Sequence, residues 1–362
     1  MKRLRIAQIA PLIERVPPVR YGGTERVVYC LTEELVRRGH DVTLFASGDS
    51  ETSATLCPIV ERALRLEGKL GSIVYASMLE LSKVYREMKG EFDIIHSHID
   101  FLTFPFVSEQ GTPTLMTLHG RLDTPDVVKM LRVYGHLNYV SISDAQRRPV
   151  PEINWAGTVY HGYPPECFEF NDTPLDYFLY LGRLSPEKAP DQAIILAKSC
   201  GVRLKIAAKI DPADREYFTQ RIEPMLDDSL IEYVGEVGEK EKIVLLKNAR
   251  ALLNTIDWPE PFGLVMIEAL GCGTPVIVRP CGSSPEIISH GKTGFICESV
   301  DDFTNAVHDT GKISRHACRK EFERRFTHAR MVDGYERIYS RLHKNHLMKA
   351  TSVLPGRMVS AG

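Results

Sequence analysis

"LRIAQIAPLIERVPPVRYGGTERVVYCLTEELVRRGHDVTLFAS", residues 4–47, contains the unit on which the fold is built. Two short apolar runs, LRIAQIA (4–10) and DVTLFAS (41–47), have the length and composition of buried β-strands. Between them, in residues 23–38, the apolar positions recur with the period of a helix. Strand, helix and strand in this order predict two parallel strands joined by a crossover helix.

The same alternation continues along the chain and then starts again. After residues 4–47, the first half of the chain has a helix at 72–88 and the strand-like runs DIIHSH (93–98), TLMTLH (114–119) and YVSIS (139–143). The second half begins with the strand-like run DYFLYLG (176–182), which is followed by VRLKIAA (202–208), IEYVGE (231–236), ALLNT (251–255) and TPVIVR (274–279). Helices are expected between these runs at 186–200, 212–226, 239–248 and from 263. Strands that alternate with helices predict parallel sheets covered on both faces. We therefore expect two α/β domains, 1–168 and 169–330, then a C-terminal helix, 331–345, and a flexible tail, 346–362.

Composition limits the partners of the protein. With 362 residues, 43% hydrophobic, 25% charged and a formal net charge of −2, the chain is ordinary for a globular protein. No basic stripe indicates nucleic-acid binding, and no apolar run is long enough to span a membrane, although peripheral membrane contact stays open. The first 23 residues indicate a strand, not a signal peptide. The eight cysteines include no Cys-x-x-Cys pair, which favours free thiols in a cytoplasmic protein.

Three features of the N-terminal half point to a cleft. Gly22 and Gly23 follow the first strand and open a helix, where backbone N–H groups favour an anion; a plain tight turn is the alternative. His96 and His98 lie two apart on a strand, but no third ligand has the spacing of a metal site, so we expect no metal there. His119 ends the strand TLMTLH, where its side chain would project into a cleft.

Two cations mark the start of the second half. Arg183 comes just after a strand, and Lys188 falls in the first turn of the helix that Ser185 and Pro186 would begin. Cations are unfavourable at this end of a helix unless an anion is bound, and a diphosphate would suit them; two solvated side chains are the alternative. The sequence has no Asp-x-Asp pair to hold a divalent metal over phosphates.

The stretch DWPEPFGLVMIEALGCG, residues 257–273, places two carboxylates around a helix N-terminus. We expect that helix to start near Phe262, so Glu260 precedes it and Glu268 lies two turns inside. Eight residues span roughly 12 Å of helix, the order of the distance between the sugar and the ribose of a sugar nucleotide. Two unrelated glutamates, one stabilised by the helix dipole and one on the surface, are the alternative.

These motifs resemble those of a known family. EPFGLVMIEALGCGTPVI (260–277) and GSSPEIISHGKTGFIC (282–297) are similar to the signature of the retaining nucleotide-sugar glycosyltransferases of family 4. GGTERVV, SISDAQ, VYHGYP, LYLGRLSPEKAPDQAI and EYVGEV match the same family in the same order. The resemblance implies the GT-B fold, in which two Rossmann-like domains with parallel sheets face each other across a cleft, and the C-terminal helix crosses back to the N-terminal domain.

The resemblance also implies a site and an activity: transfer of a sugar from a nucleoside diphosphate to an acceptor hydroxyl, without metal or cofactor. The N-terminal domain would bind the acceptor and the C-terminal domain the donor. Catalytic roles would fall to Glu260, His119, Arg183 and Lys188. The donor would also contact Gly22, Gly23, Glu236, Val237, Phe262, Gly263, Leu264 and Glu268, with Glu260 at the sugar, Glu268 at the ribose, and Glu236 and Val237 at the base.

The acceptor cannot be named from the sequence. Glu25, Arg121 and Arg147 are candidates to line its side of the cleft. Two positions depart from the family: His161-Gly162 replaces an Asn-Gly pair, and Gly282-Ser283 replaces Gly-Gly. Two other functions stay open, a nucleotide-sugar epimerase of the same fold and a non-catalytic protein that binds a nucleotide sugar.

Overall fold

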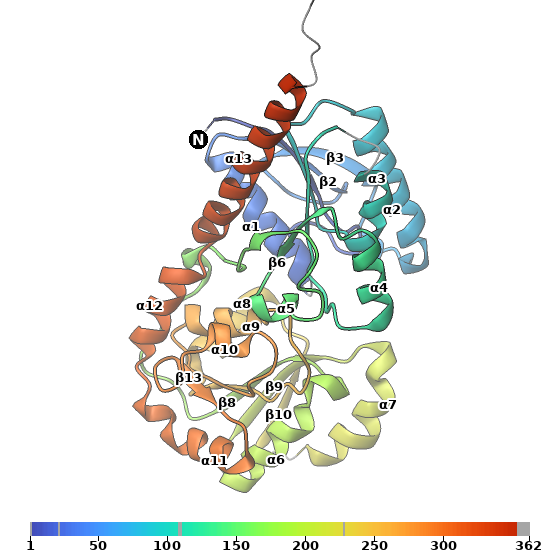
Figure 1. Ribbon diagram of the computed structural model, residues 1–362. Coiled ribbons are helices and arrows are strands. Elements are labelled where there is room, and N and C mark those ends of the chain that lie inside the picture. The colour runs from blue at the N-terminus through green and yellow to red at the C-terminus, as the bar shows by residue number, and fades with distance from the viewer. Residues whose placement is uncertain (1, 21, 108–110, 227–228, 353–362) are drawn as a thin grey trace, which may run out of the picture.

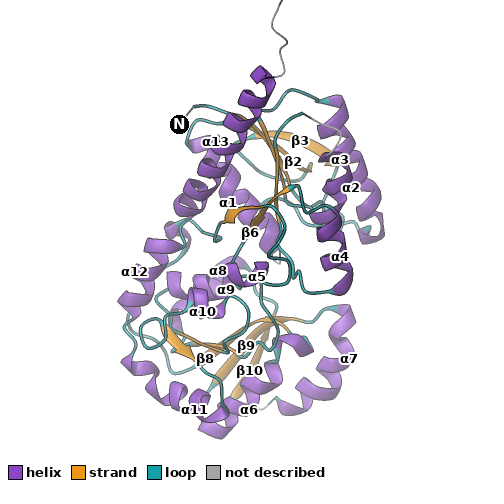
Figure 2. Cartoon of the chain, in the orientation of Figure 1, coloured by secondary structure: helices purple, strands orange, loops and turns teal. Residues whose placement is uncertain are grey.

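The computed structural model describes residues 2–20, 22–107, 111–226 and 229–352, which form two lobes (Figure 1). Each lobe has a parallel β-sheet with helices packed on it, as Figure 2 shows by secondary structure. The sequence-based prediction of two α/β domains with parallel sheets is therefore confirmed.

In the N-terminal domain, the described residues form a seven-stranded sheet in the order β3-β2-β1-β4-β5-β6-β7. Its strands are β1 (Arg5–Ile9), β2 (Asp41–Ser47), β3 (Thr55–Val60), β4 (Ile94–Ser97), β5 (Thr114–Thr117), β6 (Asn138–Ser141) and β7 (Trp155–Thr158). All four residues of β4 are buried, as expected for a parallel strand covered on both faces. The strand order reverses between β1 and β4.

In the C-terminal domain, the described residues form a six-stranded sheet in the order β10-β9-β8-β11-β12-β13. Its strands are β8 (Phe178–Arg183), β9 (Leu204–Lys209), β10 (Ile231–Gly235), β11 (Leu252–Asn254), β12 (Val276–Val278) and β13 (Gly294–Ile296). The order reverses between β8 and β11, in the same way as in the first sheet. At such reversals the loops from neighbouring strands run to opposite faces and leave a place for a ligand.

The helices cover both sheets. They are α1 (Gly23–Arg37), α2 (Ile73–Ser82), α3 (Phe104–Val107), α4 (Pro125–Val133), α5 (Asp144–Arg147), α6 (Pro190–Cys200), α7 (Arg215–Tyr217), α8 (Glu239–Asn248), α9 (Leu264–Gly271), α10 (Ser284–Ile287), α11 (Val300–Asp309), α12 (Arg315–Arg325) and α13 (His328–Ser352). Within the described ranges, no helix combines the length and the apolar character that crossing a bilayer requires.

Three predicted helices differ from the observed ones. The helix expected at 186–200 begins only at Pro190, after a 3-10 turn at Pro186–Lys188 and a left-handed Ala189 (φ 48°). The ring of Pro190 disfavours helical backbone in the residue before it, so Ser185 and Pro186 do not cap α6 as predicted. The segment 212–226 is a series of short helical turns ended by Pro224, which lacks an N–H group. The helix expected near Phe262 starts at Leu264.

The cysteines are all free, as expected. Burial was expected for most of them, and it is observed for half: Cys30, Cys272, Cys297 and Cys318 are buried, whereas Cys167 is exposed and the other three are partly exposed. The first four lie in α1, at the end of α9, next to β13 and in α12, where an apolar thiol fills the core.

The C-terminal helix α13 crosses back to the N-terminal domain (Figure 1). It is longer than predicted, because the residues up to Ser352 that were expected in the tail continue the helix; residues 353–362 lie outside the described residues. Tyr335 and Tyr339 of α13 are fully buried in that domain. At the end of α1, Arg38 donates to Asp333 (2.8 Å) and Glu336 (2.6 Å) of α13.

The ion pairs between Arg38, at the C-terminus of α1, and α13 allow a test of how much α13 stabilises the protein. Arg38 also donates to Glu34, whose side chain is 1% exposed. Although burial favours the neutral acid, hydrogen bonds from Arg37 and Arg38 lower the pKa of Glu34 to about 2. Arg38→Ala leaves buried carboxylates without this cation, and we expect a loss of about 3 kcal/mol in the free energy of unfolding, measured by urea denaturation.

The matched control is Arg37→Ala. Arg37 also binds Glu34, but its side chain is 70% exposed, so we expect a loss below about 1 kcal/mol. Equal losses for the two variants would show that the contact between α1 and α13 adds nothing to stability.

Candidate functional site

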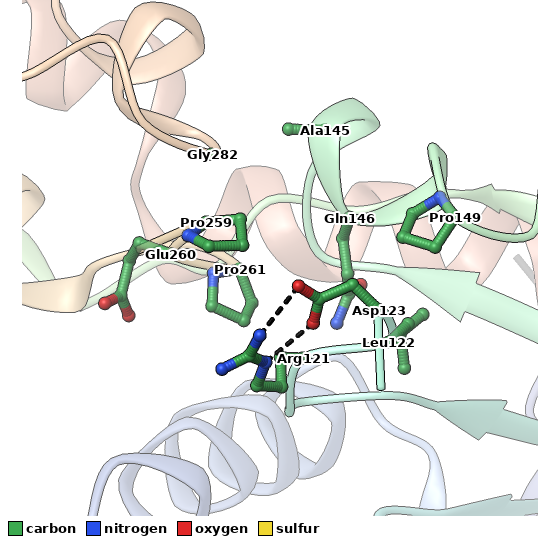
Figure 3. A pocket seen from close by; sticks show the side chains of 10 residues that line it. All are labelled: Arg121, Leu122, Asp123, Ala145, Gln146, Pro149, Pro259, Glu260, Pro261 and Gly282. Atoms are coloured by element: carbon green, nitrogen blue, oxygen red, sulfur yellow. Dashed lines mark hydrogen bonds and ion pairs between the residues drawn. The ribbon is translucent and has the colours of Figure 1, made fainter. Parts of the chain in front are cut away.

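Segments that follow β5 and β6 in the first domain and β11 and β12 in the second meet between the domains. A small pocket of about 30 Å³ lies there (Figure 3). Its lining comes from both domains: Arg121, Leu122, Asp123, Ala145, Gln146 and Pro149 from the first, and Pro259, Glu260, Pro261 and Gly282 from the second. The structure therefore places Glu260 and Arg121, both predicted from the sequence, on the same interdomain surface.

Glu260 and Lys188 form an ion pair, although 72 residues separate them in the sequence. The same carboxylate oxygen accepts a hydrogen bond from the indole N–H of Trp258 (3.0 Å). The ammonium group of Lys188 lies 4.8 Å from the centre of the Trp258 ring, close enough for a cation–π contact. The carboxylate is thus held in place by two neighbours before any ligand is considered.

The loop that carries Gly282 and Ser283 packs directly on Glu260. A Cβ atom at Gly282 would meet the backbone oxygen of Glu260 at 2.2 Å, and the residue has a positive φ of 56°, so only glycine fits. The backbone N–H of Ser283 donates to that oxygen (3.0 Å), and its hydroxyl donates to the oxygen of Phe262 (2.7 Å). The departure from Gly-Gly therefore adds a hydrogen bond that fixes the backbone between Glu260 and the start of α9.

The carboxylates that pair with Arg183 differ from the one that pairs with Lys188. Arg183 pairs with Glu187 and, at 3.2 Å, with Asp214. The structure thus places the two predicted phosphate-binding cations at the end of β8 and in the 3-10 turn after it, each held by its own carboxylate. Their convergence on one diphosphate stays a prediction.

Glycines begin the two helices that face each other across the interface. Gly22 precedes α1 and Gly263 precedes α9, and neither helix has a side chain that caps its first N–H groups. A Cβ atom at Gly23 would lie 3.0 Å from Leu264 Cδ1, so the start of α1 lies directly against the start of α9. Two uncapped N-termini in one place favour an anion between the domains.

Glu268 lies inside α9 and is 5% exposed. Its carboxylate pairs with Lys242 (2.8 Å), which also pairs with Glu239 (3.0 Å). Glu239 in turn pairs with Arg26 of α1 (3.1 Å). This series of ion pairs connects Glu268 to the other domain, and it could not be predicted because it joins residues of α1, α8 and α9 that are distant in the chain.

A second pocket, of about 500 Å³, lies beside α8. It is lined by Val234, Glu236, Val237, Lys240, Glu241, Val244 and Leu245, which include the two residues predicted to contact the base. Across the interface, Arg20 lies 4.0 Å from Glu236. The pocket is large enough for a nucleobase, but that use stays a prediction.

The three candidates for acceptor contact differ in their surroundings. Glu25 is 5% exposed, and burial raises its pKa to about 7. Arg121 forms a two-point contact with Asp123 (2.6 and 2.8 Å; Figure 3) and lies 5.3 Å over the Trp258 ring. Arg147 lies 5.1 Å over Trp155. Of these three, Arg121 lines the interdomain pocket, and all three roles stay predictions.

His119 lies in a group of buried aromatic rings at the ends of β4 and β5. It contacts His98 on one side and stacks on His161 on the other, with ring centres 5.2 Å apart in both cases. His161 also contacts Phe262 (4.9 Å), so the departure from Asn-Gly puts an aromatic ring between the two domains. Burial lowers the pKa of His119 to about 3 and those of His96, His98 and His161 well below the usual range.

These histidines are therefore neutral, and His96, His98 and His119 form hydrogen bonds through their ring nitrogens. Among the described residues, no group of three or more histidine, cysteine or acidic side chains could hold a metal ion. The residues that sequence reasoning missed are Trp258, Lys242 and Glu239. Trp258 lies in the stretch quoted for Glu260 and could have been noticed there, whereas the other two depend on contacts between distant segments.

Two family models match the chain. Residues 169–321 match the family described as glycosyl transferases group 1, and residues 21–153 match glycosyltransferase family 4. Together they leave out only residues 1–20, 154–168 and 322–362. Each model thus corresponds to one of the two observed domains.

The chain is similar in sequence to several named proteins. D-inositol 3-phosphate glycosyltransferase of Mycolicibacterium smegmatis is 29% identical over 179 residues, covering 45% of this chain and 39% of that protein. Glycogen synthase of Mycobacterium tuberculosis is 24% identical over 338 residues, covering 79% and 81%. N-acetyl-alpha-D-glucosaminyl L-malate synthase of Bacillus anthracis is 30% identical over 112 residues, covering 28% and 29%. Two of these three relatives are therefore matched over less than two thirds of their length.

Solved structures have the same fold. AviGT4, a glycosyltransferase involved in avilamycin A biosynthesis, has a TM-score of 0.69 at 22% identity, covering 94% of this chain and 98% of that one. Anabaena HepE, solved with UDP-glucose, has a TM-score of 0.66 at 15% identity, covering 97% and 100%. With both domains matched by family models, and with glycosyltransferases among both the relatives and the structural neighbours, this chain belongs to glycosyltransferase family 4 and has the GT-B fold.

Proposed function

We propose that this glycosyltransferase moves a sugar from a nucleoside diphosphate to an acceptor hydroxyl, with retention of the anomeric configuration and without a metal ion or cofactor. The observation that carries the proposal is the pair of Glu260 and Lys188 beside the uncapped start of α9, on the surface where the domains meet. A carboxylate for sugar hydroxyls and a cation for phosphate thus lie next to each other. HepE, the structural neighbour solved with UDP-glucose, binds a donor of this class.

The chemistry follows from an exchange of partners. When a diphosphate binds, Lys188 turns from Glu260 to the phosphate, and Glu260 is free to accept hydrogen bonds from sugar hydroxyls. Arg183 makes the same exchange from Glu187 and Asp214. The cations and the N–H groups at the start of α9 then stabilise the negative charge that develops as the diphosphate leaves. The acceptor attacks from the face that the diphosphate leaves, and a phosphate oxygen takes its proton.

The rest of the donor fits along α8 and α9 in this proposal. Glu268 accepts hydrogen bonds from the ribose hydroxyls, and the pocket beside Glu236 and Val237 takes the base. Contact between the domains excludes water, which would otherwise compete with the acceptor. We place the reaction in the cytoplasm and leave open a peripheral contact with a membrane; the acceptor is not assigned.

The proposal is tested by incubating the purified protein with UDP-, GDP-, ADP- and TDP-sugars and following nucleotide release and sugar products by mass spectrometry. Release that depends on an added acceptor supports sugar transfer, and the configuration of the product, read by NMR, tests retention. Reversible formation of a donor isomer without acceptor indicates an epimerase instead. Binding without turnover of any donor indicates a non-catalytic protein.

The two glutamates of the motif should affect different steps. Glu260→Gln removes a charged acceptor at the sugar, so we expect kcat to fall about a hundredfold with little change in nucleotide affinity. Glu268→Gln should weaken nucleotide binding about tenfold and leave kcat nearly unchanged, because a hydrogen bond to a charged group is lost at the ribose. Steady-state kinetics and calorimetry with the nucleoside diphosphate separate the two. The same effect from both variants would contradict the assigned roles.

Lys242 should act through Glu268. In Lys242→Met the buried carboxylate of Glu268 loses its partner cation, and we expect nucleotide affinity to fall about tenfold because the carboxylate is no longer held in position for the ribose. Lys247→Met is the matched control, since Lys247 lies on the same helix and pairs with the exposed Glu169. An equal fall in affinity in the control would contradict a specific role for Lys242.

A further inference from the structure

A three-residue turn joins Trp258 to Glu260. It lies in the loop between β11 and α9, where the backbone N–H of Glu260 donates to the backbone oxygen of Trp258 (2.8 Å). Pro259, between the two residues, has a restricted φ that suits such a turn. The turn brings the two side chains together, and the indole N–H of Trp258 donates to Oε2 of Glu260 (3.0 Å).

This hydrogen bond has only one possible direction. An indole nitrogen carries a proton and accepts nothing, so Nε1 of Trp258 can only donate. In the described part of the chain, no hydrogen bond reaches the other carboxylate oxygen of Glu260, and the side chain is 14% exposed. Trp258 therefore binds one oxygen of the carboxylate and leaves the second one available to a ligand.

The loop after β11 is tied to the turn after β8. The backbone N–H of Asp257 donates to the backbone oxygen of Glu187 (3.1 Å). The hydroxyl of Thr255 donates to the backbone oxygen of Ala189 (2.7 Å). These two bonds flank Lys188 in the chain, so backbone contacts hold the turn that carries this cation against the loop that carries the indole ring.

Cations from both domains lie over the indole ring of Trp258. The ammonium group of Lys188, from the second domain, is 4.8 Å from the ring centre, and the guanidinium group of Arg121, from the first, is 5.3 Å from it. Arg121 and Glu260 line the same interdomain pocket (Figure 3). The orientation of the ring, and with it the direction of its N–H group, therefore depends on both domains.

Donor binding would remove one of the two partners of Glu260. In the proposed function, Lys188 turns from this carboxylate to the diphosphate. Of the side chains in the described ranges, Trp258 is then the one that still donates to it. A small displacement of a group that contacts the reacting sugar costs a large factor in rate. The indole N–H is thus most important when the sugar is bound.

We propose that Trp258 is a positioning residue, whose indole N–H holds one carboxylate oxygen of Glu260 while Lys188 binds the diphosphate. The other oxygen then accepts a hydrogen bond from a hydroxyl of the donor sugar. The proposal rests on the proposed function for the identity of the ligand, but the hydrogen bond and its direction do not depend on it. Phenylalanine at this position would keep an aromatic ring beside the two cations and would lose the donor to Glu260.

The first experiment examines the hydrogen bond in the full-length protein without ligand. The chain has two tryptophans, so protein labelled with 15N-tryptophan gives two indole N–H signals by NMR, and the one that remains in Trp155→Phe belongs to Trp258. We expect Glu260→Ala to move the Trp258 signal to a lower proton shift, because the hydrogen bond is lost. The Trp155 signal should stay in place, since that indole donates to the backbone oxygen of Val150 (3.0 Å).

The second experiment measures sugar transfer with the donor identified by the nucleotide-release assay. We expect Trp258→Phe to lower kcat about tenfold, while the affinity for the nucleoside diphosphate alone changes less than about twofold. Trp155→Phe is the matched control, because it removes an indole hydrogen bond of the same length from β7. We expect the control to change kcat less than about twofold.

A double variant separates the positioning of Glu260 from a general structural role of Trp258. If Trp258 acts through Glu260, its replacement should have little further effect once the carboxylate is gone. We therefore expect Trp258→Phe to lower the residual kcat of Glu260→Ala less than about twofold. A tenfold fall in both backgrounds, or an equal fall in kcat and in nucleotide affinity, overturns the proposal.

The NMR comparison distinguishes failure of the inference from failure of the function on which it rests. A Trp258 signal that stays in place in Glu260→Ala overturns the inference and leaves the proposed function intact. Absence of transfer from any donor overturns the proposed function and, with it, the sugar as the ligand of Glu260. Since the NMR comparison keeps Trp258 in the chain, it decides on the hydrogen bond even if Trp258→Phe does not fold.

Discussion

The site depends on the close approach of two helix N-termini. Gly23 at the start of α1 touches Leu264 at the start of α9, and neither helix has a capping side chain. Two positive helix ends in one place repel each other unless negative charge lies near them. Among the described residues, one acidic side chain, Glu25, lies in the first turn of α1, and α9 has none in its first turn. A diphosphate placed between the helices would supply negative charge there. The repulsion between the two helix ends, which costs free energy in the protein alone, therefore favours binding of the proposed donor.

In the ion pairs around this point, each glutamate of the motif is paired with a lysine. Lys188 pairs with Glu260, and Lys242 pairs with Glu268, so each carboxylate of the motif is held in position by a lysine. The two pairs differ in depth: the side chain of Glu260 is 14% exposed and that of Glu268 is 7% exposed. The more accessible pair is the one whose partners must separate when phosphate binds, whereas the deeper pair can stay intact while the carboxylate accepts bonds from a ribose. Different depths therefore suit different roles.

The sequence predicted the parts of this arrangement that depend on local pattern. Strand and helix alternation predicted both sheets, and the spacing of Glu260 and Glu268 placed both around one helix N-terminus. The sequence could not predict that Lys188 would meet Glu260, because a contact across 72 residues depends on how β8 and β11 lie side by side. The start of α6 was predicted four residues too early because Pro190 overrides the apolar period before it. The burial that keeps the histidines neutral depends on tertiary packing, so no local sequence pattern predicts it.

The two domains therefore offer chemically different surfaces to one ligand. The C-terminal domain supplies charges in pairs, which suits an anion and its counterions. The N-terminal domain supplies His119, which burial keeps neutral and which forms a hydrogen bond with His98. A nucleoside diphosphate sugar is divided in the same way, because its diphosphate is charged and its sugar carries only hydroxyl groups. The helix α13, which begins beside the C-terminal domain and ends on the N-terminal one, places Tyr339 against Gln8 and His96, so the last part of the chain helps to build the buried side of the site.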